Sequence, residues 1–378
     1  MIDVRTIEAE LSAAFLERQD EIRGLMIGLL SKQHVLMYGP PGTGKSALTR
    51  AFLSHISDAA GFELLMNKFT APESLEGPLD MSELTNGRYI RKRDGYLTHS
   101  DVAFLDEIFR SNAAALNTML AIMNEGIYHE EGKRHPSRLS LIVGASNDLP
   151  DGDELNAFSD RFLLRFNTRY LSQSGRAKLH RMADATYNPT NVITMADVQA
   201  LRAAVGSVTF SNSINDQLDK IFQLAMDEGL TISDRAIRQV KRAIAANAVI
   251  DGRVTVNDDD LDVMRHTLWK NPSDIHKAAT IVGSCVNPIK AKANEMIDDA
   301  MSVYNKVKLL FNKPRTNEAQ TECITANSKL GEIATKIGDC IKSHGPGTYF
   351  DTAEKKVDAM RNNIVGYMMG RIEVMVDV

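Results

Sequence analysis

Short apolar runs alternate with helical patterns over the first 170 residues of the chain. Residues 7–31 have apolar positions at the three- and four-residue spacing of a helix. Further along, buried strands are predicted at 34–38, 102–105 and 139–145, a further strand at 62–69, and helices at 47–59 and 112–123. Because strands that alternate with helices form parallel sheets covered on both faces, the pattern predicts an α/β domain over residues 1–170.

Helical patterns replace the strand signals after Tyr170. They are clearest at 214–227 and 233–248, which predicts an all-α domain over residues 171–270. The pair Asn271-Pro272 is typical of a turn and marks the end of this domain.

The last part of the chain, residues 271–378, predicts a helical C-terminal extension. Its three helical stripes cover 275–311, 324–341 and 357–375, and Pro288 is the expected kink in the first. Asp351, followed three residues later by Glu354, has the spacing of a cap at the start of the last helix.

Composition places few restrictions on the partners of this chain. Its 378 residues, of which 43% are hydrophobic, are enough for two or three cores. The net charge of -5 gives no overall attraction to nucleic acid or to an anionic membrane. The three cysteines lack a disulfide or metal-binding spacing, and the N-terminal residues lack the pattern of a secretory signal. We therefore expect a cytoplasmic protein with protein partners and no membrane insertion.

A glycine-rich sequence lies between the predicted strand at 34–38 and the predicted helix at 47–59. In a phosphate-binding loop, glycines let backbone N–H groups point at the phosphates, Lys45 reaches the β- and γ-phosphates, and the Ser46 hydroxyl binds Mg²⁺. The alternative is a glycine-rich turn without function, and the flanking strand and helix weigh against it. The expected ATP-binding residues are Gly39, Pro40, Pro41, Gly42, Thr43, Gly44, Lys45 and Ser46.

Two carboxylates follow the predicted strand at 102–105. This position suits Asp106 for holding the Mg²⁺ shell, and Glu107 for polarising the water molecule that attacks the γ-phosphate. Taken alone, an acidic pair after a strand is more often a favourable charge at a helix N-terminus. Its position after a phosphate-binding loop favours the catalytic interpretation.

Asn147 stands at the end of the predicted strand at 139–145. Open α/β sheets collect ligand-binding groups at this edge, where an amide can orient the attacking water between Glu107 and the γ-phosphate. The alternative is an asparagine that forms a turn with Asp148 and Pro150.

Six short motifs, in this order, resemble the AAA+ ATPases and, within them, the MoxR family, most closely its RavA-like branch. The resemblance runs from about Phe15 to Trp269 and implies an AAA+ P-loop core followed by an all-α lid. Besides the phosphate-binding loop, the motifs are Phe104-Leu105-Asp106-Glu107-Ile108, Leu116-Asn117-Thr118-Met119-Leu120, Ala145-Ser146-Asn147, Ser159-Asp160-Arg161-Phe162 and Ser233-Asp234-Arg235-Ala236.

The resemblance implies hydrolysis of ATP with Mg²⁺ and assigns roles to further residues. Asn147 matches the sensor-1 position. Arg161 matches an arginine finger that reaches the ATP of a neighbouring subunit, with Arg165 as the second candidate. Arg235 matches sensor 2, a lid residue that contacts the γ-phosphate. Guanidinium groups suit these roles because they form a fixed fork of donors for phosphoryl oxygens.

An arginine finger that acts on a neighbour implies a ring, which by family analogy is a homo-hexamer. The resemblance also implies remodelling of a protein client, often together with a partner that carries a von Willebrand factor A domain. Residues 86–96 resemble the helix-2 insert of the family, and residues 127–138 resemble the hairpin before sensor 1. Both are predicted to be exposed hairpins.

Two other functions stay open at this point. The basic residues from Arg88 to Arg93, beside Tyr89 and Tyr96, would suit a nucleic-acid motor, although the acidic total weighs against it. A nucleotide-gated scaffold whose tail docks a partner is the third hypothesis. After Trp269 the sequence departs from RavA and shows no counterpart of its β-rich module, so the specific partners of RavA are not carried over.

Overall fold

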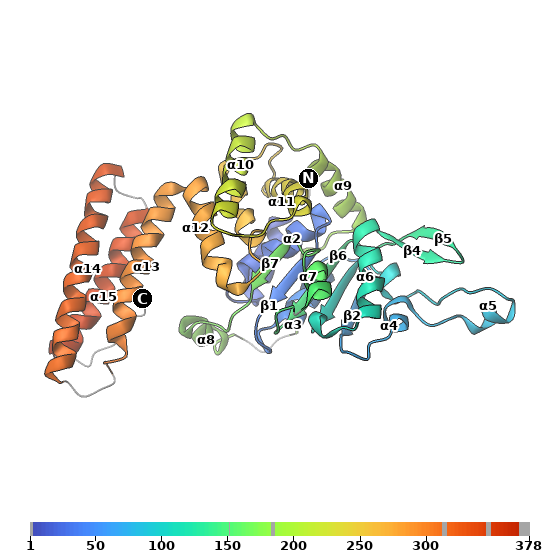
Figure 1. Ribbon diagram of the computed structural model, residues 1–378, viewed down its shortest axis with the longest axis horizontal. Helices are drawn as coiled ribbons and strands as arrows, with labels where there is room; N and C mark the ends of the chain where they lie inside the picture. The colour runs from blue at the N-terminus through green and yellow to red at the C-terminus, as the bar shows by residue number, and fades with distance from the viewer. Residues whose placement is uncertain (1–2, 151, 183–185, 312–315, 345–348, 370–378) are drawn as a thin grey trace. The chain divides into compact units, whose positions relative to one another are not determined.

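The computed structural model describes residues 3–150, 152–182, 186–311, 316–344 and 349–369. The chain divides into two compact units, Met1–Ala279 and Thr280–Val378, which are described separately. The first unit holds the sheet and the helices around it, and the second holds three long helices (Figure 1). The boundaries at 170 and 270 stay predictions from the sequence.

The first unit is built on a sheet of five parallel strands in the order β2-β3-β6-β1-β7. Strand β1 lies between β6 and β7, with Met37 opposite Ala145 on one side and opposite Phe166 on the other. The strands are β1 (Val35–Tyr38), β2 (Gly61–Leu65), β3 (Val102–Asp106), β6 (Leu141–Ser146) and β7 (Leu164–Asn167).

Side chains along the strands alternate between two apolar cores, one on each face of the sheet. In β3, Val102 and Phe104 belong to one core, and Ala103 and Leu105 belong to the other. The first core also contains residues of α1 (Arg5–Ala14), α2 (Gln19–Ser31), α3 (Lys45–Ser54), α9 (Met195–Gly206) and α11 (Asp234–Ile250). The second contains residues of α4 (Pro72–Glu76), α6 (Ala113–Glu125) and α7 (Asp153–Ser159). The predicted parallel sheet with helices on both faces is confirmed.

The prediction for the α/β region is wrong in two details. The helical pattern at 7–31 forms two helices, because the chain turns between Ala14 and Gln19 and Glu17 adopts a left-handed conformation, with φ 57°. Strand β7 is missing from the prediction. Its Arg165 interrupts the apolar pattern, yet this side chain is buried and donates hydrogen bonds to the carbonyls of Ser159 and Thr267.

Helices follow the sheet, as predicted for the lid. Serine side chains cap the two longest, since Ser211 accepts a hydrogen bond from the Ile214 N–H and Ser233 accepts one from the Ala236 N–H. The elements are α8 (Gln173–Leu179), α9, α10 (Asn212–Asp227), α11, the 3₁₀ helices η3 (Asp258–His266) and η4 (Pro272–Asp274), and α12 (Ile275–Val286).

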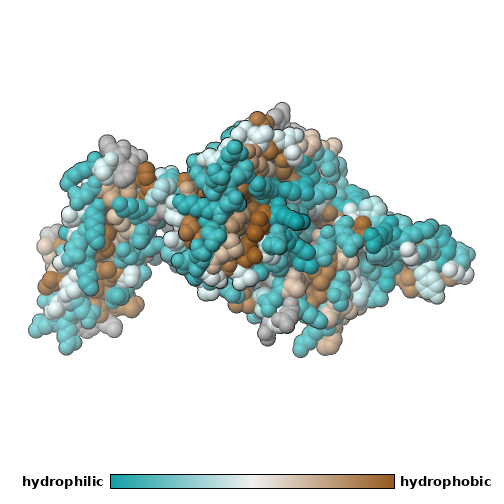
Figure 2. All heavy atoms as spheres, turned by 45° about the horizontal axis from the view of Figure 1, so that its top comes forward, coloured by the Kyte–Doolittle hydropathy of each residue, from teal (hydrophilic) through white to brown (hydrophobic). Residues whose placement is uncertain are grey.

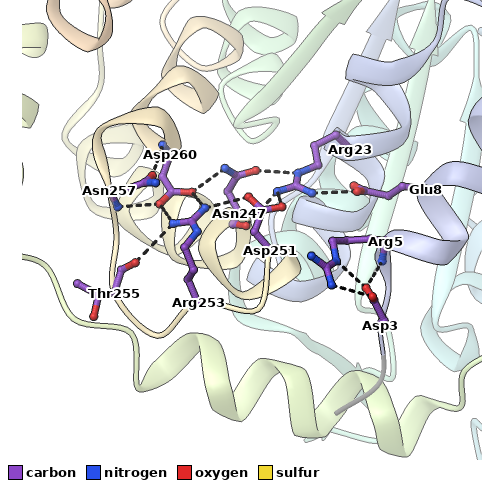
Figure 3. Close-up of polar contacts among 10 residues, drawn as sticks. All are labelled: Asp3, Arg5, Glu8, Arg23, Asn247, Asp251, Arg253, Thr255, Asn257 and Asp260. Atoms are coloured by element: carbon purple, nitrogen blue, oxygen red, sulfur yellow. Dashed lines mark hydrogen bonds and ion pairs between the residues drawn. The ribbon is translucent and has the colours of Figure 1, made fainter.

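A network of charged side chains connects the N-terminal helices to the lid (Figure 3). Arg23 in α2 forms ion pairs with Glu8 in α1, at 2.9 Å, and with Asp251 just after α11, at 2.7 Å. Arg253 in turn bonds Asp251 and the fully buried Asp260 of η3. The network therefore links α1 and α2 to α11 and η3, and all four elements belong to the first unit.

The second unit is a bundle of α13 (Pro288–Lys308), α14 (Asn317–His344) and α15 (Tyr349–Met369). Leu330, Ile337 and Met360 are fully buried in its core. Inside that core the Asn363 amide donates a 2.9 Å hydrogen bond to the Tyr304 hydroxyl. The predicted helical extension is confirmed. Among the described helices of the chain, none is long and apolar enough to cross a membrane.

Two details of the predicted extension are wrong. Pro288 separates two helices instead of kinking one, because its ring disfavours helical geometry at Asn287 and it fits best in the first turn of α13. Asp351 lies in the first turn of α15 and does not cap it, since that helix begins at Tyr349. The predicted helix end at 370–375 lies outside the described residues.

Candidate functional site

The glycine-rich loop joins the end of β1 to the start of α3, as the sequence predicts. Gly44, which immediately precedes α3, has φ 85°, a conformation that L side chains rarely adopt. Gly39 is required for another reason, because a Cβ atom there would lie 2.0 Å from the carbonyl oxygen of Thr168. The sequence therefore folds into a loop that brings the backbone close to the end of the sheet.

Lys45 is buried at the base of this loop and is 7% exposed. Its ammonium group donates to the carbonyls of Gly39, at 2.7 Å, and Pro40, at 3.0 Å, and to Oδ1 of Asn147, at 3.3 Å. Burial lowers the pKa of Lys45, while the carboxylates of Asp106 and Glu107 oppose that shift. The structure thus brings the predicted lysine, the acidic pair and the predicted sensor asparagine into one electrostatic cluster.

Asp106 and Glu107 follow each other at the carboxyl end of β3. Glu107 adopts a left-handed conformation, φ 51° and ψ 41°, and its N–H donates to Oδ1 of Asp106 at 3.0 Å. Non-glycine residues in this conformation are uncommon and are concentrated at functional sites.

The Glu107 carboxylate is held by two side chains. Asn147, just after β6, donates its amide hydrogen to Oε1 at 2.7 Å. The second oxygen, Oε2, is buried and lies 3.5 Å from Nε of Arg110, which also pairs with Asp148. One contact chain therefore runs from Lys45 through Asn147 to Glu107, across the ends of three adjacent strands of the sheet.

Ser46 and Asp106 are the residues that could hold a metal ion. Ser46 is the second residue of α3, and Asp106 ends β3, so the loop and the sheet each supply one group. A hydroxyl and a carboxylate offer oxygen ligands alone, which is the donor chemistry that Mg²⁺ prefers.

Arg161 and Arg235 lie near each other, although they are far apart in the sequence. Arg161 follows α7, and its Nε is buried with no hydrogen-bond partner among the described residues. Burial and then the neighbouring Arg235 lower the pKa of Arg161. Arg235, in the first turn of α11, donates to Oδ1 of Asn124 at the end of α6, at 3.0 Å. The two arginines form a positively charged pair.

Arg165, the second finger candidate, is placed differently. Its side chain is 3% exposed and is bonded to two carbonyls of its own subunit. Burial lowers its pKa to about 10. Because the guanidinium is enclosed and bonded within its own chain, Arg165 supports the fold of β7, which weighs against its use as an arginine finger.

The segment at 86–96 lies in a part of the first unit that projects from the rest of that unit (Figure 1). A hairpin is present there, but the predicted bounds are wrong, because its first strand precedes residue 86. The paired residues are 78–80 and 90–92, linked by hydrogen bonds from Asp80 to Ile90 and from Lys92 to Pro78, with the short helix α5 (Met81–Thr85) between them. The second predicted hairpin is confirmed as β4 (Ile127–Glu130) and β5 (Lys133–Pro136). Hydrophilic residues cover most of the projection in Figure 2.

The arginines of this projection are paired with glutamates. Arg88 pairs with Glu83, and Arg91 lies 3.4 Å from Glu76. Arg93 is 5% exposed, stacks over the Tyr128 ring at 4.0 Å and pairs with Glu130. The basic cluster is therefore largely neutralised, which removes the main support for a nucleic-acid motor.

Sequence reasoning missed two residues that contact the phosphate-binding loop. The buried Arg18 donates to the carbonyl of Thr43, and the Tyr170 hydroxyl donates to the carbonyl of Pro41. Neither lies in a recognisable motif, and both are brought to the loop by tertiary structure.

Two cavities of the first unit lie elsewhere. They measure about 200 and 190 Å³, share Asp20, Phe166, Arg265 and His266 among their lining residues, and neither is lined by the loop at 39–46.

Comparison with known proteins agrees with this geometry. Residues 2–204 match the family described as the MoxR domain in the MoxR-vWA-beta-propeller ternary systems, and residues 209–282 match an AAA lid domain. An uncharacterized protein of Methanocaldococcus jannaschii is 34% identical over 373 residues, which are 96% of this chain and 99% of that protein.

Two more distant similarities point the same way. Chaperone MoxR1 of Mycobacterium tuberculosis is 23% identical over 296 residues, covering 70% of this chain and 76% of its own length. A crystal structure from Cytophaga hutchinsonii, described as that of a candidate ATPase, shares the fold with a TM-score of 0.61 at 18% identity, over 75% of this chain and 93% of that one. The family model covers more than half of the chain and the relative in M. jannaschii matches nearly all of it, so this chain belongs to the MoxR family of AAA+ ATPases.

Proposed function

We propose that this chain hydrolyses Mg²⁺-bound ATP in a ring of identical subunits and uses the energy to remodel a protein client. The contact chain from Lys45 through Asn147 to Glu107 carries the hydrolytic part of the proposal. These contacts join the phosphate-binding loop to the acidic end of β3. A phosphate bound at the loop would therefore lie beside the Glu107 carboxylate, whose direction Asn147 already fixes.

Each residue of the cluster has one role in this proposal. Backbone N–H groups of the loop and Lys45 bind the phosphates, while Ser46 and Asp106 hold the metal. Mg²⁺, when bound, neutralises charge on the β- and γ-phosphate oxygens. Glu107 polarises the attacking water, and Asn147 fixes the direction of its carboxylate. Water is the nucleophile, and the bond that breaks joins the γ-phosphorus to its bridging oxygen.

The charged pair of Arg161 and Arg235 supports the ring. Two neighbouring guanidinium groups repel each other, and after burial the charge of Arg235 lowers the pKa of Arg161, so the pair is best stabilised by an anion shared between them, such as a γ-phosphate. In this proposal both arginines reach the nucleotide of the adjacent subunit, and the site is complete between two copies of the chain. The hexamer is the ring size that the family analogy favours.

The client is a protein, and a von Willebrand factor A domain protein is the proposed partner. Support comes from the matched family, whose description places MoxR domains in MoxR-vWA-beta-propeller systems, and from the relative described as a chaperone. The cytoplasmic location and the RavA-like branch stay predictions from the sequence.

The test is ATP-dependent capture with the Glu107→Gln variant, which binds ATP without turning it over. The full chain is compared with a chain that ends at Asn287, before α13, since the second compact unit begins near this point. The proposal expects a protein that is retained with ATP, absent with ADP and released by wild-type turnover. Retention that is independent of nucleotide would contradict remodelling.

A further inference from the structure

The turn between α1 and α2 presses Arg18 against the phosphate-binding loop. Arg18 is only 7% exposed. Its Nε and Nη2 lie 3.3 and 3.1 Å from the carbonyl oxygen of Thr43, and Nη2 also donates to the carbonyl of Arg169, just after β7, at 2.7 Å. The remaining nitrogen, Nη1, donates to the carbonyl of Glu17 at 2.8 Å. Every nitrogen of this guanidinium thus donates to a backbone carbonyl, and two of the three carbonyls belong to residues far from Arg18 in the sequence.

The contact to Thr43 fixes the orientation of one peptide group. A peptide unit is planar and trans, so its C=O and N–H point in opposite directions. Because Arg18 holds the Thr43 carbonyl toward itself, the N–H of Gly44 points to the opposite side. The N–H groups of a phosphate-binding loop act only when they converge on the phosphates. Arg18 therefore fixes the direction of one N–H donor of the loop from the opposite side of the peptide group.

A second contact of the same kind is made two peptide groups earlier in the loop. The Tyr170 hydroxyl donates to the Pro41 carbonyl at 3.3 Å, which turns the N–H of Gly42 away from Tyr170. Tyr170 is 64% exposed, so this contact is weaker than the one made by Arg18. Of the two side chains that contact carbonyls of the loop, Arg18 is the more buried.

The same turn is tied to the segment that leads into the lid. Glu17, next to Arg18, accepts hydrogen bonds from the N–H and the hydroxyl of Ser172, the residue that caps α8. A Cβ atom at Gly175 would lie 2.4 Å from Oε1 of Glu17, so a larger residue there would make the Glu17 carboxylate shift. Adjacent side chains of one turn thus hold the phosphate-binding loop and the start of α8.

We propose that Arg18 is a positioning residue for phosphate binding, which aims the Gly44 N–H and couples the loop to the chain segment at 169–172. This inference rests on the proposed binding of ATP at the loop. It predicts a defect shared by ATP and ADP, because the orientation of the loop affects phosphates that both nucleotides carry.

The experiment measures the dissociation constants of ATP and ADP, and the KM and kcat of hydrolysis, for the full-length Arg18→Ala chain. Loss of a hydrogen bond from a charged group corresponds to about 10-fold to 100-fold weaker binding. We expect this factor in both dissociation constants and in KM, with a smaller change in kcat. Arg18→Lys keeps one charged donor and is expected to recover part of the affinity, and Tyr170→Phe to lose roughly 2-fold to 10-fold.

Arg202→Ala is the matched control. Arg202 is 8% exposed and donates through two nitrogens to a single backbone carbonyl, that of Leu29, away from the loop. It should lower the unfolding temperature as Arg18→Ala does, yet leave nucleotide affinity unchanged. If Arg18→Ala does not fold, the Arg18→Lys and Tyr170→Phe variants carry the comparison.

The outcomes separate this inference from the proposed function. If wild type does not bind ATP, or Lys45→Ala binds it equally well, the proposed site itself is wrong. If Lys45→Ala loses binding while the folded Arg18 variants bind like wild type, the positioning role is wrong. A loss for ATP without a loss for ADP would also overturn it, because that pattern requires a direct contact with the γ-phosphate.

Discussion

The side-chain amide of Asn147 donates a 2.7 Å hydrogen bond to Oε1 of Glu107. The same amide group, through its oxygen, accepts from the Lys45 ammonium at 3.3 Å. An amide is suited to this position because it donates on one side and accepts on the other. Asn147 therefore bridges Glu107, the proposed base, and Lys45, the proposed phosphate ligand, and the proposed roles of the three residues can be separated by substitution.

Asn147→Asp replaces the donor with a second carboxylate. The new charge repels Glu107 and leaves its oxygen without a donor, so kcat should fall by about 100-fold, as for loss of one preorganised donor elsewhere. The comparison is steady-state hydrolysis against Asn212→Asp, an exposed position at the start of α10. An unchanged kcat would show that Asn147 does not orient the carboxylate.

Glu107→Gln should retain ATP and lose turnover, since the amide accepts no proton from water. We expect at least a roughly 100-fold lower kcat with nearly unchanged ATP affinity. Lys45→Ala should show the opposite pattern, in which the main loss is in ATP affinity. Equilibrium binding and single-turnover hydrolysis measure the two quantities, and wild-type turnover by Glu107→Gln would remove its proposed role.

Arg161→Ala subunits mixed with Lys45→Ala subunits should recover some activity. At an interface where an intact phosphate-binding loop faces an intact arginine, the site is complete, although each variant alone is inactive. Because Arg235 lies beside Arg161, Arg235→Ala should be rescued in the same mixtures. Activity is measured across mixing ratios. Rescue of Arg161→Ala without rescue of Arg235→Ala would place Arg235 on the nucleotide of its own subunit.

Asp260→Ala should destabilise the first unit by about 3 kcal/mol, because it leaves the Arg253 guanidinium without its buried partner. Asp262→Ala is the control, since its pair with Arg265 is long, at 3.4 Å, and the carboxylate is 46% exposed. Such a pair contributes less than about 1 kcal/mol. Urea unfolding followed by circular dichroism measures both, and equal losses would contradict the buried network of Figure 3.

Two half-buried histidines predict how stability changes in mild acid. Burial lowers the pKa of His34 and of His266 to about 4, from an ordinary 6.5. His34 accepts a hydrogen bond from the Ile142 N–H, and His266 accepts one from Arg265, so both rings are neutral in the fold.

As the pH falls, these histidines take up protons near pH 6.5 in the unfolded chain, but only near pH 4 in the folded chain. The free energy of unfolding is therefore highest above pH 6.5 and decreases as the pH falls toward 4. The expected slope is about 1.4 kcal/mol per pH unit for each histidine. Unfolding in urea between pH 7.5 and 4.5 measures it. His266→Gln should reduce the slope, and the same slope in that variant would exclude His266 as its source.

Much of this architecture follows from local patterns. The runs at β1, β3 and β6 are short, apolar and bounded by turns, and they were sufficient to predict a parallel sheet whose carboxyl edge collects Asp106, Glu107 and Asn147. The amphipathic stripes likewise predict the bundle of α13, α14 and α15, because each buries one face.

The features that the sequence does not predict depend on tertiary partners. Strand β7 contains a buried arginine whose cost is offset by two backbone carbonyls, and nothing local reveals those acceptors. Arg18 resembles any helix-flanking arginine until the fold brings Thr43 to it. The pairing of Arg91 and Arg93 with glutamates outside their own segment is hidden for the same reason.

The cation–π contact between Arg93 and Tyr128 has a mechanical meaning. It fastens the segment at 86–96 to the β4–β5 hairpin, which is the direct continuation of α6. The other end of α6 is capped by Asn112, five residues after Glu107 in the chain. Glu107, α6, the β4–β5 hairpin and the segment at 86–96 are therefore linked in sequence by short connections and one side-chain contact, so we expect a displacement of Glu107 to be transmitted through α6 to both projecting segments.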